Sequence, residues 1–126
     1  MSVWPMIALL LTATAAIALA TEPTEGPYRL PGVSAADNEL QRGAANMLWM
    51  LEGIADVRNP ELAAACELTE RRIINTEVTK LPKKPGRSPW KEKWTVDRCG
   101  DVVHYSIKFT PTPKQGGTDF EVSLIE

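Results

Sequence analysis

The sequence predicts an α+β domain, with one N-terminal helix packed on a four-stranded antiparallel β-meander and one disulfide. Three observations lead to this prediction. Apolar residues recur every three or four positions between residues 40 and 55, apolar and polar residues alternate in three later segments, and the chain has two cysteines. With 126 residues, the chain is long enough for one domain with one core.

The first twenty residues have the composition of a secretory signal peptide. An apolar run extends from Met6 to Leu19, and Ala18-Leu19-Ala20 has the small-x-small pattern that signal peptidase cleaves. We therefore expect an exported protein, periplasmic or secreted, that begins at Thr21 and has no stable membrane insertion after cleavage. The alternative is an uncleaved anchor from Val3 to Leu19, which is short for a span and rich in alanine and threonine.

A proline-rich lead-in and then a helix are expected after the signal peptide. Residues 21–32 show no periodicity, which predicts a flexible lead-in to a single domain over residues 33–126. Ser34 is the expected N-cap of a helix that runs to Arg58, and Asn59-Pro60 ends it. Pro60 can begin one more helical turn, to Ala65. The apolar stripe consists of Leu40, Ala44, Met47, Leu48, Leu51, Ile54 and Ala55.

The rest of the chain alternates as strands do. Three strands are expected over residues 90–97, 103–109 and 119–124, and a fourth over Cys66–Leu81. In the fourth, Ile73 and Ile74 point to opposite faces, so either a bulge lets both pack or one is exposed. The expected hairpin registers are Trp94 with Tyr105, Val96 with Val103, Trp90 with Phe109, Phe109 with Phe120, and Lys108 with Glu121.

This register also predicts the core and the disulfide. Ile107 and Val122 should be buried under the helix. Cys66 enters the first strand and Cys99 leaves the second, so both lie at one open end of a hairpin, within bridging reach. An even number of cysteines in an exported chain is typical of disulfides.

Residues for metal, cofactor or triad chemistry are few, so we expect no metal and no cofactor. There is no C-x-x-C pair, and His104 is the only histidine. No serine stands in a G-x-S-x-G turn, and Gly116-Gly117 lacks the Lys-Ser/Thr of a phosphate-binding loop.

Glu92 is the most unusual residue of the expected sheet. It lies two residues from both Trp90 and Trp94, so its side chain points to the same inner face of the strand. An unpaired carboxylate is costly there. One interpretation is an acid/base group or a grip for a cationic ligand. We favour the other, a position at the sheet margin with an ion pair to Arg71 or Arg72.

The segment from Lys80 to Trp94 is basic although the whole chain has a net charge of −2. Cations interleaved with tryptophans are typical of polyanion-binding surfaces. For an exported protein the partner would be an anionic envelope component or an acidic protein, and no nucleic acid is expected. The alternative is a solvated hairpin tip whose lysines protect a sheet edge. The candidate ligand-binding residues are Lys83, Lys84, Arg87, Trp90, Glu92 and Trp94.

Three segments of the sheet region carry a resemblance. They are WKEKWTVDRCG at 90–100, YSIKF at 105–109 and GGTDF at 116–120. Together they resemble a group of small exported proteobacterial proteins with no assigned activity, over about residues 66–124. The resemblance implies a periplasmic or secreted location and a disulfide-bearing sheet, and it supplies no catalytic residues.

The sequence thus leaves three functional hypotheses. We favour a non-enzymatic binding module that presents the Lys80 to Trp94 hairpin and the outer sheet face to an anionic partner. The rival is a small hydrolase or acid/base enzyme that uses Glu92 with Arg71 or Arg72 and His104. The third is an inhibitor-like interaction protein that uses the loop at residues 111–117. The oligomeric state is left open.

Overall fold

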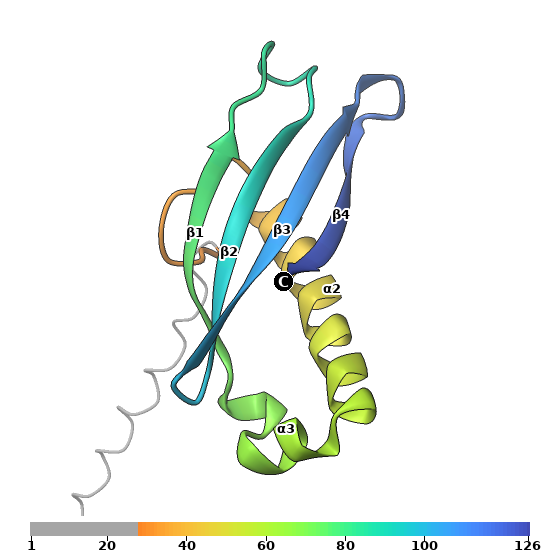
Figure 1. Ribbon diagram of the computed structural model, residues 1–126. Coiled ribbons are helices and arrows are strands. Elements are labelled where there is room, and N and C mark those ends of the chain that lie inside the picture. Colours follow the sequence, from red (N-terminus) through yellow and green to blue (C-terminus); the bar gives the residue numbers. More distant parts are fainter. Residues whose placement is uncertain (1–27) are drawn as a thin grey trace, which may run out of the picture.

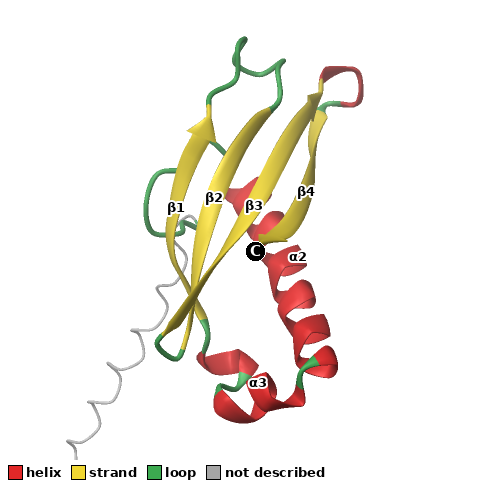
Figure 2. Cartoon of the chain, in the orientation of Figure 1, coloured by secondary structure: helices red, strands yellow, loops and turns green. Residues whose placement is uncertain are grey.

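The computed structural model describes residues 28–126, so the expected signal peptide and residues 21–27 of the lead-in lie outside the described part. One long helix covers one face of a sheet of order β1-β2-β3-β4 (Figure 1), and the element types are coloured in Figure 2. All neighbouring strands are antiparallel, which confirms the α+β prediction. The elements are α2 (Asn38–Arg58), α3 (Pro60–Ala65), β1 (Arg72–Lys80), β2 (Trp90–Arg98), β3 (Asp101–Thr112) and β4 (Gly117–Ile125), with short 3₁₀ turns at Leu68–Glu70 and Pro113–Gln115.

The expected hairpin registers are confirmed. Trp90, Trp94 and Val96 of β2 lie opposite Phe109, Tyr105 and Val103 of β3. Likewise, β4 places Phe120 opposite Phe109 and Glu121 opposite Lys108. The matching of apolar side chains across neighbouring strands therefore correctly predicted which face of the sheet points inward.

The first strand is shorter than expected. Residues 66–71 connect α3 to β1 and contain the 3₁₀ turn at Leu68–Glu70. Because β1 begins only at Arg72, the predicted strand over Cys66–Leu81 starts too early. The register between β1 and β2 shifts between Ile73 and Asn75, which is a bulge. Ile73 is buried at 7% exposure, whereas Ile74 is 42% exposed. The bulge thus lets one isoleucine pack and leaves the other outside.

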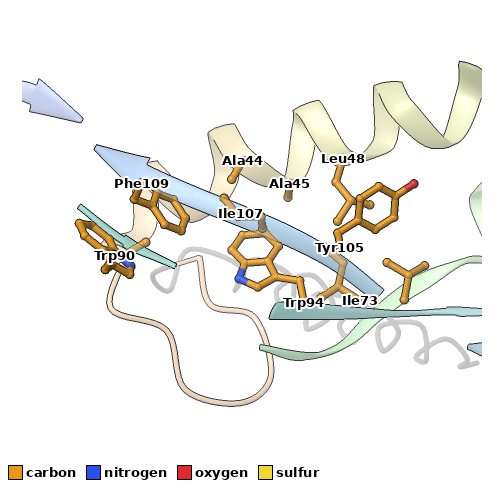
Figure 3. Packing of buried hydrophobic residues seen from close by; sticks show 11 residues of the cluster. Ala44, Ala45, Leu48, Ile73, Trp90, Trp94, Tyr105, Ile107 and Phe109 are labelled. Carbon is orange, nitrogen blue, oxygen red and sulfur yellow. The ribbon is translucent and has the colours of Figure 1, made fainter. Parts of the chain in front are cut away.

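The core lies between α2 and the inner face of the sheet (Figure 3). Ile107 is fully buried, as expected, while Val122 is only half-buried because it lies near the uncovered edge at β4. On the helix, Ala44 and Leu48 pack inward as the periodicity predicted. Ile54 of the same stripe is 43% exposed, so the C-terminal half of α2 is less covered than expected.

The beginning of the helix differs from the expectation. Asp37, not Ser34, is the N-cap, and its carboxylate accepts from the Leu40 N–H at 2.8 Å. The Ser34 hydroxyl instead donates to a buried carboxylate, described below. Leu30, in the expected flexible lead-in, packs against the core and donates its N–H to the Gln41 side chain at 3.0 Å. The packed part of the chain therefore begins before residue 33.

The predicted disulfide between Cys66 and Cys99 is present, with a Cα–Cα distance of 5.8 Å. Cys66 follows α3 directly and precedes β1 rather than lying in it. Cys99 and Gly100 form the two-residue turn between β2 and β3, with φ of 55° and 103°.

Among residues 28–126, no helix has both the length and the hydropathy that a membrane crossing requires.

Candidate functional site

Glu92 lies in the core, where two tryptophans hold its carboxylate. It is 1% exposed, and it accepts the indole N–H of Trp90 at Oε2 and that of Trp94 at Oε1, both at 2.8 Å. Residues two apart in a strand share a face, so the W-x-E-x-W spacing places an indole on each side of the carboxylate. Figure 3 shows the two indole nitrogens turned toward one another.

The same carboxylate also binds the segment before α2. The Ser34 hydroxyl lies 2.8 Å from Oε1, and the Ala35 N–H donates to Oε2 at 2.8 Å. Four donor groups, none of them charged, thus satisfy Glu92. Buried polar groups require such partners, which explains why Ser34 serves Glu92 and leaves the helix N-cap to Asp37.

The expected ion pair of Glu92 with Arg71 or Arg72 is wrong. Arg71 is buried and donates to Glu52 Oε1 at 2.9 Å and to Asp56 at 2.5 Å, both on α2. Arg72 is exposed, because it lies on the outer face of β1. The antiparallel register decides this, because Glu92 lies opposite Val78, whereas Arg72 lies opposite Asp97 at the other end of the hairpin and Arg71 precedes it.

Glu52 is a second buried carboxylate, which the sequence interpretation missed. It is fully buried and accepts from Arg71, from Arg98 and from the Tyr105 hydroxyl. Arg71 also donates to the Cys66 carbonyl at 2.8 Å, which ties the cluster to the disulfide. The helical spacing could have revealed it. Glu52 lies four residues after Leu48, so both side chains belong to the inner face of α2.

The charges of this cluster are balanced and mutually stabilised. Burial acts to raise the pKa of Glu52, but the hydrogen bonds from Arg98, Tyr105 and Arg71 outweigh it and hold the pKa below its usual value. Burial, and then the hydrogen bond to Glu52, raise the pKa of Tyr105. The hydrogen bond with Glu52 raises the pKa of Arg98. At neutral pH Glu52 is therefore ionised and the Tyr105 hydroxyl is neutral. We call Glu52, Arg71, Arg98 and Tyr105 the clamp, because they connect α2 to the sheet.

The residues proposed for acid/base catalysis are not brought together. Glu92 and Arg71 belong to separate buried clusters. His104 is on the outer face of β3, where its Nδ1 lies 3.0 Å from the Thr95 hydroxyl. Glu70 lies beside Cys66 and Cys99, but both sulfurs are used in the disulfide, so this group is not a set of metal ligands.

Three lysines from three strands meet on the outer face of the sheet. Lys91 lies between Lys80 of β1 and Lys108 of β3 in adjacent register positions. All three are exposed, and together with Pro89 and Trp90 they line a hollow of about 190 Å³. Like charges directly opposite in a sheet are destabilising. We call Lys80, Lys91 and Lys108 the lysine row.

The predicted hairpin cations lie in the loop that joins Lys80 to Lys91. Lys83, Lys84 and Arg87 are exposed in the loop between β1 and β2, where the Arg87 N–H donates to the Lys84 carbonyl at 2.9 Å. Arg87 also lines a larger hollow of about 670 Å³ with Lys114 and Asp119. The loop thus adds three exposed cations to the end of the sheet at which Lys80 and Lys91 lie.

The tryptophans and Glu92 are not part of this exposed surface. Trp94 is fully buried, and Trp90 is 7% exposed at the border of the lysine hollow. Of the six candidate ligand-binding residues, only the three hairpin cations are thus freely exposed. Lys108 was not among the candidates, although the expected register already placed it beside Lys91.

Comparison of the chain with protein-family models, with curated proteins and with solved structures found no match.

Proposed function

We propose that this chain is a small exported binding module, periplasmic or secreted, that takes an anionic partner on the basic end of its sheet. The observation that carries the proposal is the lysine row. Three like charges in adjacent register positions oppose folding. Glu121 lies opposite Lys108, but no ion pair within 4.0 Å neutralises any of the three lysines among residues 28–126. An anion in the hollow would relieve this repulsion.

The interior supports a binding role over catalysis. Both buried carboxylates, Glu92 and Glu52, have all their oxygens engaged by protein donors. Neither lines the hollow at the lysine row, the one beside β4 or the one around Trp90 and Pro111. A general acid or base must reach its substrate, so these groups suit a structural role. The proposed partner is an envelope component with phosphate or carboxylate groups.

The test is a binding titration with vesicles that contain phosphatidylglycerol, and with neutral phosphatidylcholine vesicles as a control. One variant replaces the lysine row by serine, and a second replaces Lys83, Lys84 and Arg87 by serine. A control variant replaces the exposed Arg29, Arg42 and Arg72 by serine, so the loss of charge is matched. We expect the first two variants to bind at least about tenfold more weakly and the control to bind as the wild type does. If all three variants lose the same affinity, binding depends only on net charge, which would contradict a specific anion site.

A further inference from the structure

The two edges of the sheet are built differently. The edge at β1 is protected, because Val33 donates to the Thr76 carbonyl at 2.9 Å and the Thr76 hydroxyl donates to the Pro31 carbonyl at 2.8 Å. The register of β1 also shifts twice. Natural proteins use covering segments and bulges of this kind to stop edge strands from pairing with other chains.

The edge at β4 has none of these protections. Its nine residues pair with β3 without a register shift, and it contains no lysine and no proline. No segment among residues 28–126 pairs with its other side. In Figure 1, β4 is the outermost strand on the side where α2 emerges from behind the sheet.

Exposed apolar side chains lie next to this open edge. A groove of about 510 Å³ separates the C-terminal half of α2 from β4, and its walls include Leu51 and Ile54 on one side and Val122 and Leu124 on the other. Ile54 is 43% and Leu124 40% exposed. Nearer its N-terminus, α2 approaches β4 closely, because Gly43 lies against the Phe120 ring. Polar residues such as Arg58 and Glu126 also line the groove. An open strand edge beside exposed apolar side chains indicates an interaction surface.

The sequence of β4 is complementary to itself. Two copies paired antiparallel about Val122 would place Val122 opposite Val122 and Phe120 opposite Leu124 on the inner face. On the outer face, Glu121 would meet Ser123 and Asp119 would meet Ile125. The two neighbouring registers are worse, because one sets Glu121 opposite Glu121 and the other sets Phe120 opposite Glu126. A single register thus matches apolar residues and avoids like charges.

We propose that the occupant of this edge is a second copy of the chain, joined through β4 about a two-fold axis at Val122. The two sheets become one eight-stranded sheet, and the two α2 helices lie on the same face beside the axis. Each copy then covers the groove of the other, which removes Ile54 and Leu124 from water. The same patch serves both copies, as a two-fold interface requires. This dimer is independent of the proposed anion site.

The test is sedimentation of the purified protein over a range of concentrations. We expect a monomer–dimer equilibrium. Ser123→Glu places two like-charge pairs with Glu121 across the axis and should raise the dissociation constant about tenfold. Ser123→Lys replaces them by two attractive pairs and should lower the dissociation constant. The matched control is Thr79→Glu on the exposed part of the β1 edge, which should change nothing.

The two Ser123 variants act in opposite directions, so a folding defect in one of them cannot imitate the expected result. Circular dichroism of each variant confirms that it is folded. A protein that stays monomeric at all concentrations would overturn the proposal. So would a dimer that Thr79→Glu weakens as much as Ser123→Glu does, because its interface would not be β4.

Discussion

Arg98 binds both carboxylate oxygens of Glu52, through Nε at 3.0 Å and Nη2 at 2.7 Å. The contact joins the end of β2 to the C-terminal half of α2. Paired hydrogen bonds of this kind combine charge with fixed geometry. Since Arg71 reaches the same carboxylate and also the Cys66 carbonyl, the clamp and the disulfide secure one end of the helix–sheet contact together.

Removal of Glu52 should therefore be costly. Glu52→Ala leaves the buried Arg71 and the partly buried Arg98 without their shared partner, so we expect the free energy of unfolding to fall by about 3 to 5 kcal/mol. Urea denaturation measures this. The control is Glu67→Ala, an exposed carboxylate whose loss should change the free energy by less than about 0.5 kcal/mol. Similar effects of the two substitutions would show that the clamp does not stabilise the fold.

The same residue predicts a dependence of stability on acid. Because the pKa of Glu52 is lower in the folded protein than its usual value of 4.5, the unfolded chain takes up the proton first as the pH falls. The stabilisation is complete above pH 4.5 and is lost as the pH falls through the lower folded pKa. Urea denaturation in a pH series should show that Glu52→Gln removes part of this loss. If the free energy of unfolding falls with pH equally in the wild type and in Glu52→Gln, the loss does not come from Glu52.

Much of the fold could be predicted from local patterns, and the errors lie where tertiary contacts decide. Alternation fixed the registers of β2, β3 and β4 because each had three or more apolar residues to match. β1 had few, so its start could not be found from residues 66–71. The cap of α2 was assigned to Ser34 because no local rule shows that a carboxylate 58 residues later requires its hydroxyl.

Glu92 should act in folding and not in binding. Glu92→Gln replaces one carboxylate oxygen by an amide NH₂, which cannot accept the donors that meet there, and should cost about 2 to 3 kcal/mol. Denaturation measures the cost, with the half-exposed Glu77→Gln as a control. Vesicle binding of Glu92→Gln, measured below its unfolding temperature, should equal that of the wild type. Lost binding in a folded variant would instead place Glu92 in the ligand site.

The disulfide should supply a large share of the stability. Cys66 and Cys99 are 33 residues apart, and a loop of this length is worth about 3 to 4 kcal/mol in the chain-entropy description. Replacing both cysteines by serine should lower the free energy of unfolding by about this amount. Thiol counting under denaturing conditions should find no free thiol in protein from an oxidising compartment. Two reactive thiols would contradict both the bridge and the expected export.

The candidate site was predictable only in part. Charge clustering in the sequence correctly located Lys83, Lys84 and Arg87 on the surface, because loop lysines seldom bury their charge. The alternation of β2 already predicted that Trp90 and Trp94 point into the core. Their selection as ligand-binding candidates conflicted with that prediction. Lys108 is distant in sequence from the basic segment, and only the strand register brings it to Lys91.

The most direct test of the proposed function is the salt dependence of binding to phosphatidylglycerol vesicles. Exposed charges are screened over about 8 to 10 Å at physiological salt, so wild-type affinity should fall steeply between low and physiological salt. The variant with serine at Lys80, Lys91 and Lys108 should bind weakly at low salt and show a much flatter decline. Wild-type affinity that is indifferent to salt, or a variant whose decline equals that of the wild type, would contradict binding of an anion by the lysine row.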